Sequence, residues 1–467
     1  MNEEKNTVGG GSVAKFVILS LLGLFLFLAP IPDGQGAFNI PLGIAINELN
    51  GLFGQVSLGT YAPDATDGTL GLHYLLALIA ITVSFVGTVV AYLFKPGFIM
   101  DNPKLKALFR CSPVYFVSKA VAVVVIWMFF MGVGPDFIVN AWTGDVILGL
   151  AAGLMTIFLI LIPAMPFVTE FGLMEFIGIC IRKAVRFLFT LPGRASVDLM
   201  ASWFGSSAAS VIITRGQHER GFYTGREAAV IAVNFSFVSL PFTFVIARTI
   251  DLQAHFLLFY AAIAITCVIL ALILPRIWPL RNLPDTYLEE VGKQIKEDVP
   301  ENTSTVKWAF DQASQRASKS SAKSVVESGA SSYLNIFMDL IPVIMAWGTI
   351  AIILVEFTPI FTWISYPLGL YLQLLGVEGA MDVAPTALVG FIDMFLPALM
   401  LGGATIETRF ILGALSIVQI IYLAETGVLI IKSKMPLGIG KLFIIFLMRT
   451  ILGLPIIVLF ARLFFNP

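Results

Sequence analysis

Long apolar runs, separated by short polar stretches, follow one another along most of this 467-residue chain. A helix of about 20 apolar residues crosses the hydrocarbon core of a bilayer. The chain is 58% hydrophobic and 13% charged, whereas soluble domains carry about 25% charged residues. The pattern therefore predicts an all-α polytopic membrane protein. We expect crossing helices at residues 16–30, 72–94, 114–133, 146–167, 226–248, 255–275, 333–356, 408–431 and 442–465.

Four further stretches differ from crossing helices. Residues 173–190 and 359–375 are amphipathic or interrupted by proline and glycine, which favours helices at the membrane interface. Residues 197–214 and 385–403 are apolar but broken by glycine, serine and proline. Short apolar segments of this kind are typical of re-entrant helical hairpins, whose turns need polar partners that lipid cannot supply.

The same order of elements occurs twice. Each copy holds a proline-containing helix, an interfacial stretch, a hairpin, an arginine and an apolar run with polar positions. Pro163 and Pro342 are separated by 179 positions, and Arg226 and Arg409 by 183. Two copies with interrupted apolar segments are typical of transporters that bind their solute near the bilayer midplane, where the repeats meet.

The positions of lysine and arginine predict the orientation of the two copies, because these residues are concentrated on the cytoplasmic side. Residues 357–408, which include the second hairpin, contain no lysine or arginine, so this hairpin should enter from outside. The first hairpin should enter from the cytoplasm, because basic residues flank it: Arg182, Lys183, Arg186, Arg194, Arg215 and Arg220. The copies therefore form inverted-topology repeats. The same rule places the N-terminus in the cytoplasm.

These features divide the chain into four parts. Residues 1–145 form N-terminal scaffold helices, 146–275 the first repeat, 276–332 a cytoplasmic linker and 333–467 the second repeat. Within the linker, the Ser-, Ala- and Lys-rich residues 314–332 favour a mobile tether.

The first apolar run leaves two interpretations open. Lys5 and Lys15 precede it, as basic residues precede the apolar part of a signal peptide. Glu3, Glu4 and the lack of a clear small-residue cleavage site before Pro30 favour a retained helix.

Small residues mark the expected turns of the two hairpins. Gly205, Ser206 and Ser207 mark the first, and Gly402 and Gly403 mark the second. Half-helix N-termini at such turns attract anionic groups, and freed carbonyls attract cations. We expect Ser206 and Ser207 to contact solute or a coupling cation. The alternative is that small residues there only allow close helix packing.

The helix after the first hairpin has polar residues in its middle. Asn234, Ser236 and Ser239 precede Pro241, and Thr243 follows it. A proline inside a helix removes a hydrogen bond and frees a carbonyl. This helix should therefore be interrupted and present polar groups inside the membrane.

The second copy has polar residues at matching positions. At a separation of 183 positions, the residues opposite Ser236, Ser239 and Thr243 are Gln419, Tyr422 and Thr426. We expect the two sets to line a shared cavity. Plain hydrogen bonding between helices is the alternative.

Intramembrane carboxylates are costly and indicate function by default. Asp393 and Glu425 lie deepest in their apolar segments. We expect them to bind an amine or hydroxyl of the solute, or to carry the coupling cation. A salt bridge with Arg409 or Arg449 is the alternative.

Several function classes lack support. The sequence has no P-loop, HExxH or GxSxG motif, so we expect neither an enzyme nor catalytic residues. Its three cysteines have no CxxC spacing and its three histidines are scattered, so we expect no metal site or other cofactor. No basic domain indicates a nucleic-acid partner.

The paired blocks carry a resemblance to a known family. Residues 198–207, through Thr243, and residues 389–393, through Thr426, resemble Gate (nucleoside-recognition) domains. The whole chain is similar to YjiH-like bacterial membrane proteins and, more distantly, from about residue 146 onward, to concentrative nucleoside transporters. The resemblance implies a mobile transport domain of hairpins and broken helices. The Gln-Thr-Glu-Ala-Pro-Leu motif of the nucleoside carriers is absent, so the resemblance does not specify a nucleoside.

The sequence thus predicts a secondary active transporter, acting as a symporter, for a small polar organic solute such as a nucleoside, an amino acid or a small peptide-like compound. The resemblance implies that Na⁺ or H⁺ drives an elevator-type movement. The expected solute contacts are Ser206, Ser207, Asn234, Ser236, Ser239, Asp393, Gln419, Tyr422 and Glu425. The expected contacts of the coupling cation are Ser206, Ser207, Asn234, Pro241, Thr243 and Thr426.

The alternative function is an ion or metal permeation element of the Gate-domain type. Metal transport would favour Cys, Met or His at the hairpin turns, whereas these turns hold Ser, Gly and Pro. The expected partners are the solute and the lipid bilayer, and assembly as a homo-oligomer is left open.

Overall fold

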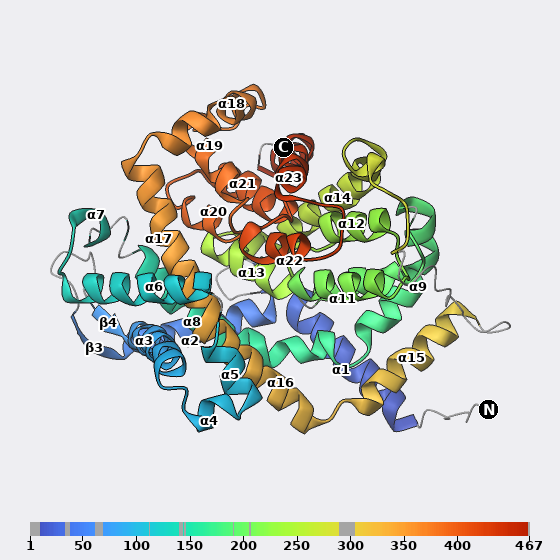
Figure 1. The fold of residues 1–467 in the computed structure, drawn as a ribbon, viewed down its shortest axis with the longest axis horizontal. Helices are drawn as coiled ribbons and strands as arrows, with labels where there is room; N and C mark the ends of the chain where they lie inside the picture. The colour runs from blue at the N-terminus through green and yellow to red at the C-terminus, as the bar shows by residue number, and fades with distance from the viewer. Residues whose placement is uncertain are drawn as a thin grey trace.

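The computed structural model describes residues 10–32, 38–60, 69–111, 113–139, 143, 146–189, 191–204, 207–288 and 304–465. Nearly all of its regular structure is α-helical (Figure 1). Five described helices are long and apolar enough to cross a membrane: Gly10–Leu28, Leu72–Leu93, Ala151–Thr169, Gln253–Arg276 and Ile439–Phe465. The prediction of an all-α polytopic membrane protein is therefore confirmed.

The N-terminal part is helical apart from two short antiparallel strand pairs that the apolar pattern did not predict. These pairs are β1 (Ile31–Pro32) with β2 (Phe38–Asn39), and β3 (Ser57–Thr60) with β4 (Thr69–Gly71). The helices are α1 (Gly10–Leu28), α2 (Pro41–Gln55), α3 (Leu72–Leu93), α4 (Gly97–Met100), α5 (Pro103–Phe109), α6 (Pro113–Met131) and α7 (Asp136–Val139).

The next part follows the order predicted for the first repeat. It contains α8 (Val146–Thr169), amphipathic α9 (Leu173–Phe189), the helix pair α10 (Ala195–Phe204) and α11 (Ser207–Glu219), the interrupted helix α12 (Gly225–Asn234) and α13 (Leu240–Thr249), and α14 (Phe256–Ile273). In α9, Gly178, Val185 and Phe189 are buried on one face, and α10 packs against this helix.

The C-terminal part repeats this order. It contains α17 (Ile341–Phe357), α18 (Ile360–Leu374), the helix pair α19 (Ala380–Val389) and α20 (Leu396–Leu399), the interrupted helix α21 (Ile406–Val418) and α22 (Val428–Ile431), and α23 (Ile439–Phe465). A π-helical turn precedes α17 at Ile336–Leu340, and another precedes α22 at Leu423–Gly427. α18 packs against α19 as α9 packs against α10. The orientation of the two copies relative to a membrane stays a prediction.

The two copies cross over one another. α11 of the first copy packs against α22 and the π-helical turn before it, and α20 of the second copy packs against α13. α13 also contacts α21. Figure 1 shows these elements together in the upper part of the view, with α1 to α5 in the lower part. Each hairpin therefore lies against the interrupted helix of the opposite copy.

The C-terminal part of the linker, from residue 305, forms packed helices, which corrects the expectation of a mobile tether at residues 314–332. α15 (Thr305–Lys319) packs against α1 and α9, and α16 (Ala322–Asn335) packs against α8. α15 buries Ala309, Ala313 and Ala317. Gly172, at φ 97°, allows this close contact, because a Cβ there would lie 2.3 Å from the Ala313 carbonyl oxygen. Because the buried side chains of α15 are small, the Ser- and Ala-rich composition did not indicate a packing face.

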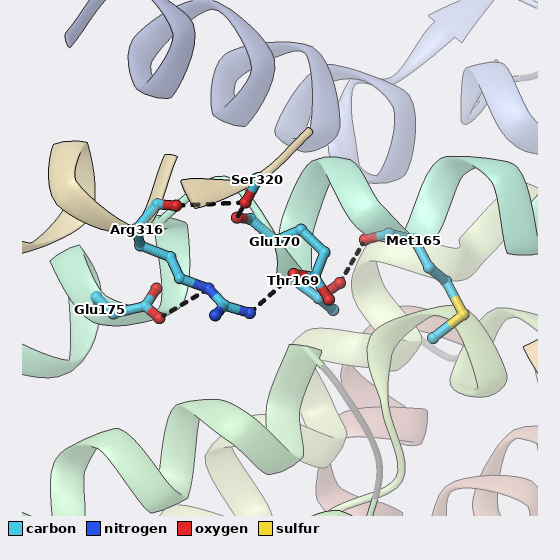
Figure 2. Close-up of polar contacts among 6 residues, drawn as sticks. All are labelled: Met165, Thr169, Glu170, Glu175, Arg316 and Ser320. Carbon is cyan, nitrogen blue, oxygen red and sulfur yellow. Dashed lines mark hydrogen bonds and ion pairs between the residues drawn. The ribbon is translucent and has the colours of Figure 1, made fainter. Parts of the chain in front are cut away.

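Polar contacts attach α15 to the first repeat (Figure 2). Arg316 Nη2 lies 2.8 Å from Glu170 Oε2, and Arg316 Nε lies 3.7 Å from Glu175 Oε1. The Ser320 hydroxyl donates to the carbonyl oxygen of Glu170 at 2.6 Å. The linker thus holds the end of α8 and the start of α9 beside the first hairpin.

Candidate functional site

The first interruption separates α12 from α13. α12 begins with a capping box, in which the Thr224 hydroxyl accepts from the Glu227 N–H and the Glu227 carboxylate accepts from the Thr224 N–H. α12 ends at Asn234, and Pro241 in the first turn of α13 has no N–H to extend a helix backwards. Residues 235–239 are extended or irregular and fully enclosed by protein. The interruption therefore places free backbone groups inside the protein.

The second interruption follows α21. Its N-cap is Thr405, whose hydroxyl accepts from the Thr408 N–H, and the helix ends at Val418. Ile420 has a φ of 60°, a left-handed conformation that is rare for a β-branched residue and is often found at functional sites. Gln419 is fully buried beside it. Both copies therefore interrupt the helix that follows the hairpin.

Threonines at equivalent positions of the two copies form hydrogen bonds with backbone carbonyls of the interruptions. The Thr243 hydroxyl donates to the Ser239 carbonyl oxygen at 3.1 Å, and the Thr426 hydroxyl donates to the Tyr422 carbonyl oxygen at 3.3 Å. Both members of one pair are 183 positions from their counterparts in the other. The structure thus shows the same local hydrogen bond at equivalent places in the two copies.

Two buried oxygens at the interruptions have no hydrogen-bond partner among the described residues. They are Ser236 Oγ and Gln419 Oε1, and both residues are 0% exposed. An unsatisfied buried polar atom costs about 1–3 kcal/mol, so each such atom indicates a place where a ligand or water supplies the partner. These two oxygens, 183 positions apart, form the centre of the candidate site.

Gly390 lies directly against the second of these oxygens. A Cβ at this position would be 2.0 Å from Gln419 Oε1. The Gln419 side chain is fixed there, because its Nε2 donates to the Ala387 carbonyl oxygen at 2.7 Å and to Thr450 Oγ1 at 2.9 Å. Only a glycine allows the hairpin backbone to come this close.

Each hairpin is fastened to the interruption of its own copy. The Ser202 hydroxyl in α10 donates to the Phe237 carbonyl oxygen at 2.8 Å. In the second copy, the Gln419 amide reaches Ala387 of α19, and the Leu423 N–H donates to the Phe391 carbonyl oxygen at 2.8 Å. Hairpin and interruption therefore form one polar unit in each copy.

Arg449 of α23 is fully buried between the two interruptions. Its Nε donates to the Val418 carbonyl oxygen at 2.7 Å. Its Nη1 donates to the Val233 carbonyl oxygen at 3.2 Å and to Asn234 Oδ1 at 2.9 Å, and its Nη2 lies 3.8 Å from Cys267 Sγ. The guanidinium thus joins the C-terminal ends of α12 and α21, one from each copy.

The predicted carboxylates have different outcomes. Asp393 is buried in the turn between α19 and α20, where its Oδ1 accepts from the Phe395 N–H at 2.8 Å. Arg409 pairs with Asp251 at 2.7 Å, so neither it nor Arg449 bonds Asp393 in the described part of the chain. The side chain of Glu425 lies outside the described part.

The hairpin turns also differ in part from expectation. The first lies between α10 and α11 as predicted, with Ser207 buried and Ser206 outside the described residues. The second lies at residues 390–395, and not at Gly402 and Gly403, which follow α20. Gly390 ends α19 here and Asp393 caps the next N–H, so these residues provide the turn chemistry.

A cavity of about 310 Å³ lies between α8, the C-terminal end of α13 and the second hairpin. Its lining includes Gly149 and Gly153 of α8, Arg248 and Thr249 of α13, and Ala398 of α20. This volume lies at the lower end of the range of small-molecule pockets, roughly 300–1,000 Å³. A compact solute would fit.

An aromatic contact lies along α13 between the interruption and Arg248. The ring of Phe242 is 6.3 Å from that of Phe158 in α8 and 5.9 Å from that of Phe395 in the second hairpin. Through these ring contacts, Phe242 of α13 lies against both α8 and the second hairpin.

Sequence reasoning missed several contributors to this site. Gly390 and Thr450 contact Gln419 in the second interruption, but neither was recognised as a polar pair or as a repeat position. Arg449 was considered only as a partner for a carboxylate. The available signal was a single arginine in the middle of the apolar run 442–465.

Comparison with known proteins agrees with this architecture. Residues 151–253, which include α9 to α13, match the Gate family, described as nucleoside recognition. With the apolar helices, this match defines a multi-pass membrane protein of the transporter class. The chain belongs to the same family as the uncharacterized protein BpOF4_10220 of Alkalihalophilus pseudofirmus. The two are 43% identical over 466 residues, covering 99% of this chain and 97% of that protein.

Solved structures show only a distant likeness. CNTnw in an inward-facing substrate-bound state is 13% identical, with a TM-score of 0.41, and the match covers 97% of this chain and 99% of that one. The YdaH transporter of Alcanivorax borkumensis is 15% identical, with a TM-score of 0.22, covering 97% and 98%. TM-scores this low decide neither the detailed topology nor the solute.

Proposed function

We propose that this protein is a secondary active transporter of a small polar organic solute, and not an enzyme. The solute binds at the two helix interruptions and reaches them from the cavity between α8, α13 and the second hairpin. The observation that carries this proposal is the pair of unpartnered buried oxygens, Ser236 Oγ and Gln419 Oε1, at equivalent positions of the two copies.

The chemistry of these atoms favours a solute with hydrogen-bond donors. Gln419 offers only an acceptor, its Oε1, because both donors of its Nε2 are already used, whereas the Ser236 hydroxyl donates or accepts. A hydroxyl, amine or amide of a nucleoside, amino acid or small peptide-like compound satisfies both. The Gate match makes nucleosides the first class to examine. Further contacts from Ser206, Ser207, Ser239, Asp393, Tyr422 and Glu425 belong to the same proposal.

Movement follows from how the elements are joined. Hydrogen bonds fasten each hairpin to its own interruption, and Arg449 joins the two interruptions. This unit meets α8 mainly through apolar side chains such as Phe158 and Phe242. We therefore propose that the unit moves as one body against α8 and the N-terminal helices, in the manner of an elevator.

Coupling to Na⁺ or H⁺ is part of the proposal. A Na⁺ ion would use carbonyl and hydroxyl oxygens near Ser207 and Pro241, because the oxygens of Asn234, Thr243 and Thr426 already have polar contacts. A proton would use Asp393 or Glu425. We place the protein in the bacterial inner membrane with its N-terminus in the cytoplasm, and a homo-oligomer is compatible with this arrangement.

Uptake into proteoliposomes tests the function. The purified protein is reconstituted and offered labelled nucleosides, amino acids and dipeptides, with a Na⁺ gradient, a pH gradient or neither. We expect uptake of members of one class, stimulated by one gradient and absent from protein-free vesicles. Absence of uptake for the whole panel, with protein that is correctly inserted, would contradict the proposal.

A further inference from the structure

The guanidinium of Arg449 occupies a position that has the properties of a cation site. Three oxygens contact it: the carbonyl oxygens of Val233 and Val418 and the side-chain oxygen of Asn234. We propose that Arg449 is a built-in cation, which holds the two helix interruptions together where a bound coupling cation would otherwise be needed.

The backbone at this position is negatively polarised. The last carbonyls of a helix have no partner within the helix, and the helix dipole places about half a negative charge at that end. Val233 lies in the last turn of α12 and Val418 is the last residue of α21. Two half-helix C-termini, one from each copy, therefore converge on a single positive group.

No carboxylate among the described residues bonds this arginine, although it is 0% exposed. A buried charge requires compensation by neighbouring groups. Here carbonyls, an amide and two helix ends supply it. Broken helices in transporters use the same groups to coordinate a coupling cation, so the arginine side chain and a mobile cation would compete for one set of oxygens.

The consequence is a junction that is assembled without an ion. Because Arg449 is covalently part of α23, both interruptions stay joined whether or not Na⁺ is present. A coupling ion, if the transporter uses one, then binds elsewhere, and the first hairpin turn is the place already proposed. This inference does not depend on the solute, so its failure would leave the proposed transport activity standing.

Chemical rescue is the decisive experiment. Arg449→Ala removes the cation and leaves its three oxygen ligands, so ethylguanidinium should bind in the vacated space. We measure the melting temperature of the full-length protein in nanodiscs during titration with ethylguanidinium chloride, with choline chloride at equal ionic strength. We expect a saturable rise of roughly 2–8 °C for Arg449→Ala that neither choline nor the wild type reproduces.

Arg462→Ala is the matched control for this titration. Arg462 lies on the same helix but is exposed, and among the described residues it bonds only the Leu375 carbonyl oxygen. This variant should respond like the wild type. A folded Arg449→Ala protein whose response to ethylguanidinium equals that of Arg462→Ala would overturn the proposal.

A second variant covers the case in which Arg449→Ala does not fold. Asn234→Asp places a carboxylate 2.9 Å from the guanidinium, and a charged Arg449 should pair with it, so the melting temperature should stay at or above the wild-type value. Thr349→Asp, in buried α17, is the control without such a partner, and it should fall by on the order of 10 °C. An equal fall for both variants would refute the built-in cation.

Discussion

Ser202 donates a hydrogen bond of 2.8 Å to the carbonyl oxygen of Phe237, which fastens the first hairpin to the interruption of its own copy. The second copy makes the same link with donor and acceptor exchanged, because Gln419 in the interruption donates to the Ala387 carbonyl oxygen of the hairpin. The two copies therefore conserve the connection between elements and not the side chain that makes it. This exchange explains why matching polar residues alone located only part of the site.

Ser236→Ala should separate binding from stability. The Ser236 hydroxyl has no hydrogen-bond partner in the described part of the chain, so its removal deletes an unsatisfied buried group and should leave the melting temperature unchanged or higher. Solute affinity should fall by about 1–3 kcal/mol, roughly 5- to 150-fold. The measurements are uptake of the panel compound that the wild type carries and thermal unfolding of both proteins.

Asn234→Ala is the contrasting variant. Asn234 Oδ1 accepts from Arg449 and its Nδ2 donates to the Val230 carbonyl oxygen, so this change should lower the melting temperature as well as uptake. Wild-type solute affinity in Ser236→Ala would remove this hydroxyl from the site.

Cysteine labelling tests the inverted orientation of the repeats. Gly221 and Gly379 lie at the ends of the two hairpins, but their φ values of 74° and 64° would strain a cysteine. The exposed neighbours Arg220 and Glu378 are better positions. In a background with Cys111→Ser and Cys180→Ser, we expect Arg220→Cys to react with an impermeant maleimide only from the cytoplasm and Glu378→Cys only from outside.

The remaining native thiol should not interfere, because Cys267 is buried. Labelling of both introduced cysteines from the same side would exclude an inverted repeat.

The element order could be predicted because apolar length, proline and glycine act locally. Residues 173–190 became α9 and residues 359–375 became α18, each close to the predicted bounds. The turn of the second hairpin was misplaced because Gly402 and Gly403 are the more conspicuous glycines in the sequence. Gly390 is instead required by its distance to Gln419, and this contact across the fold leaves no local pattern.

The candidate site was predictable to the extent that it follows the repeat. The separation of 183 positions correctly matched Thr243 with Thr426 in their backbone contacts. The repeat separation could not show that Arg449, from a third helix, joins both interruptions. Arg449 is a single residue, so it was not matched with a residue of the other copy. The helical linker was missed for a similar reason, since α15 is stabilised by contacts with α1 and α9 and not by its own composition.

Glu175→Gln should reveal a pH-dependent cost of burying a carboxylate at the linker contact. Burial raises the pKa of Glu175 above its ordinary value of 4.5, only partly offset by its own backbone hydrogen bond and by Arg316, and its Oε2 has no partner in the described residues. A raised folded-state pKa means that stability falls as pH rises from the unfolded pKa through the folded one. At pH 7, Glu175→Gln should therefore melt about 2–4 °C higher than the wild type.

The difference in melting temperature between Glu175→Gln and the wild type should vanish near pH 3, well below the ordinary pKa of 4.5, because Glu175 is then protonated in both the folded and the unfolded state. Glu170→Gln is the control, because Glu170 makes the closer contact of 2.8 Å with Arg316, and it should not be stabilised. A lower melting temperature of Glu175→Gln at pH 7 would show that the ion pair with Arg316 outweighs the burial.

Gly390→Ala tests whether the contact between the second hairpin and the Gln419 side chain is required for transport. The new methyl group would lie 2.0 Å from Gln419 Oε1, and the two hydrogen bonds of Nε2 oppose its displacement. We expect destabilisation of about 1–3 kcal/mol and a loss of uptake on the order of 10- to 100-fold. Gly403→Ala is the matched control, since a Cβ there meets no atom within 4 Å, and it should retain wild-type uptake. Equal uptake by the two variants would show that the position of Gln419 Oε1 does not matter for the solute.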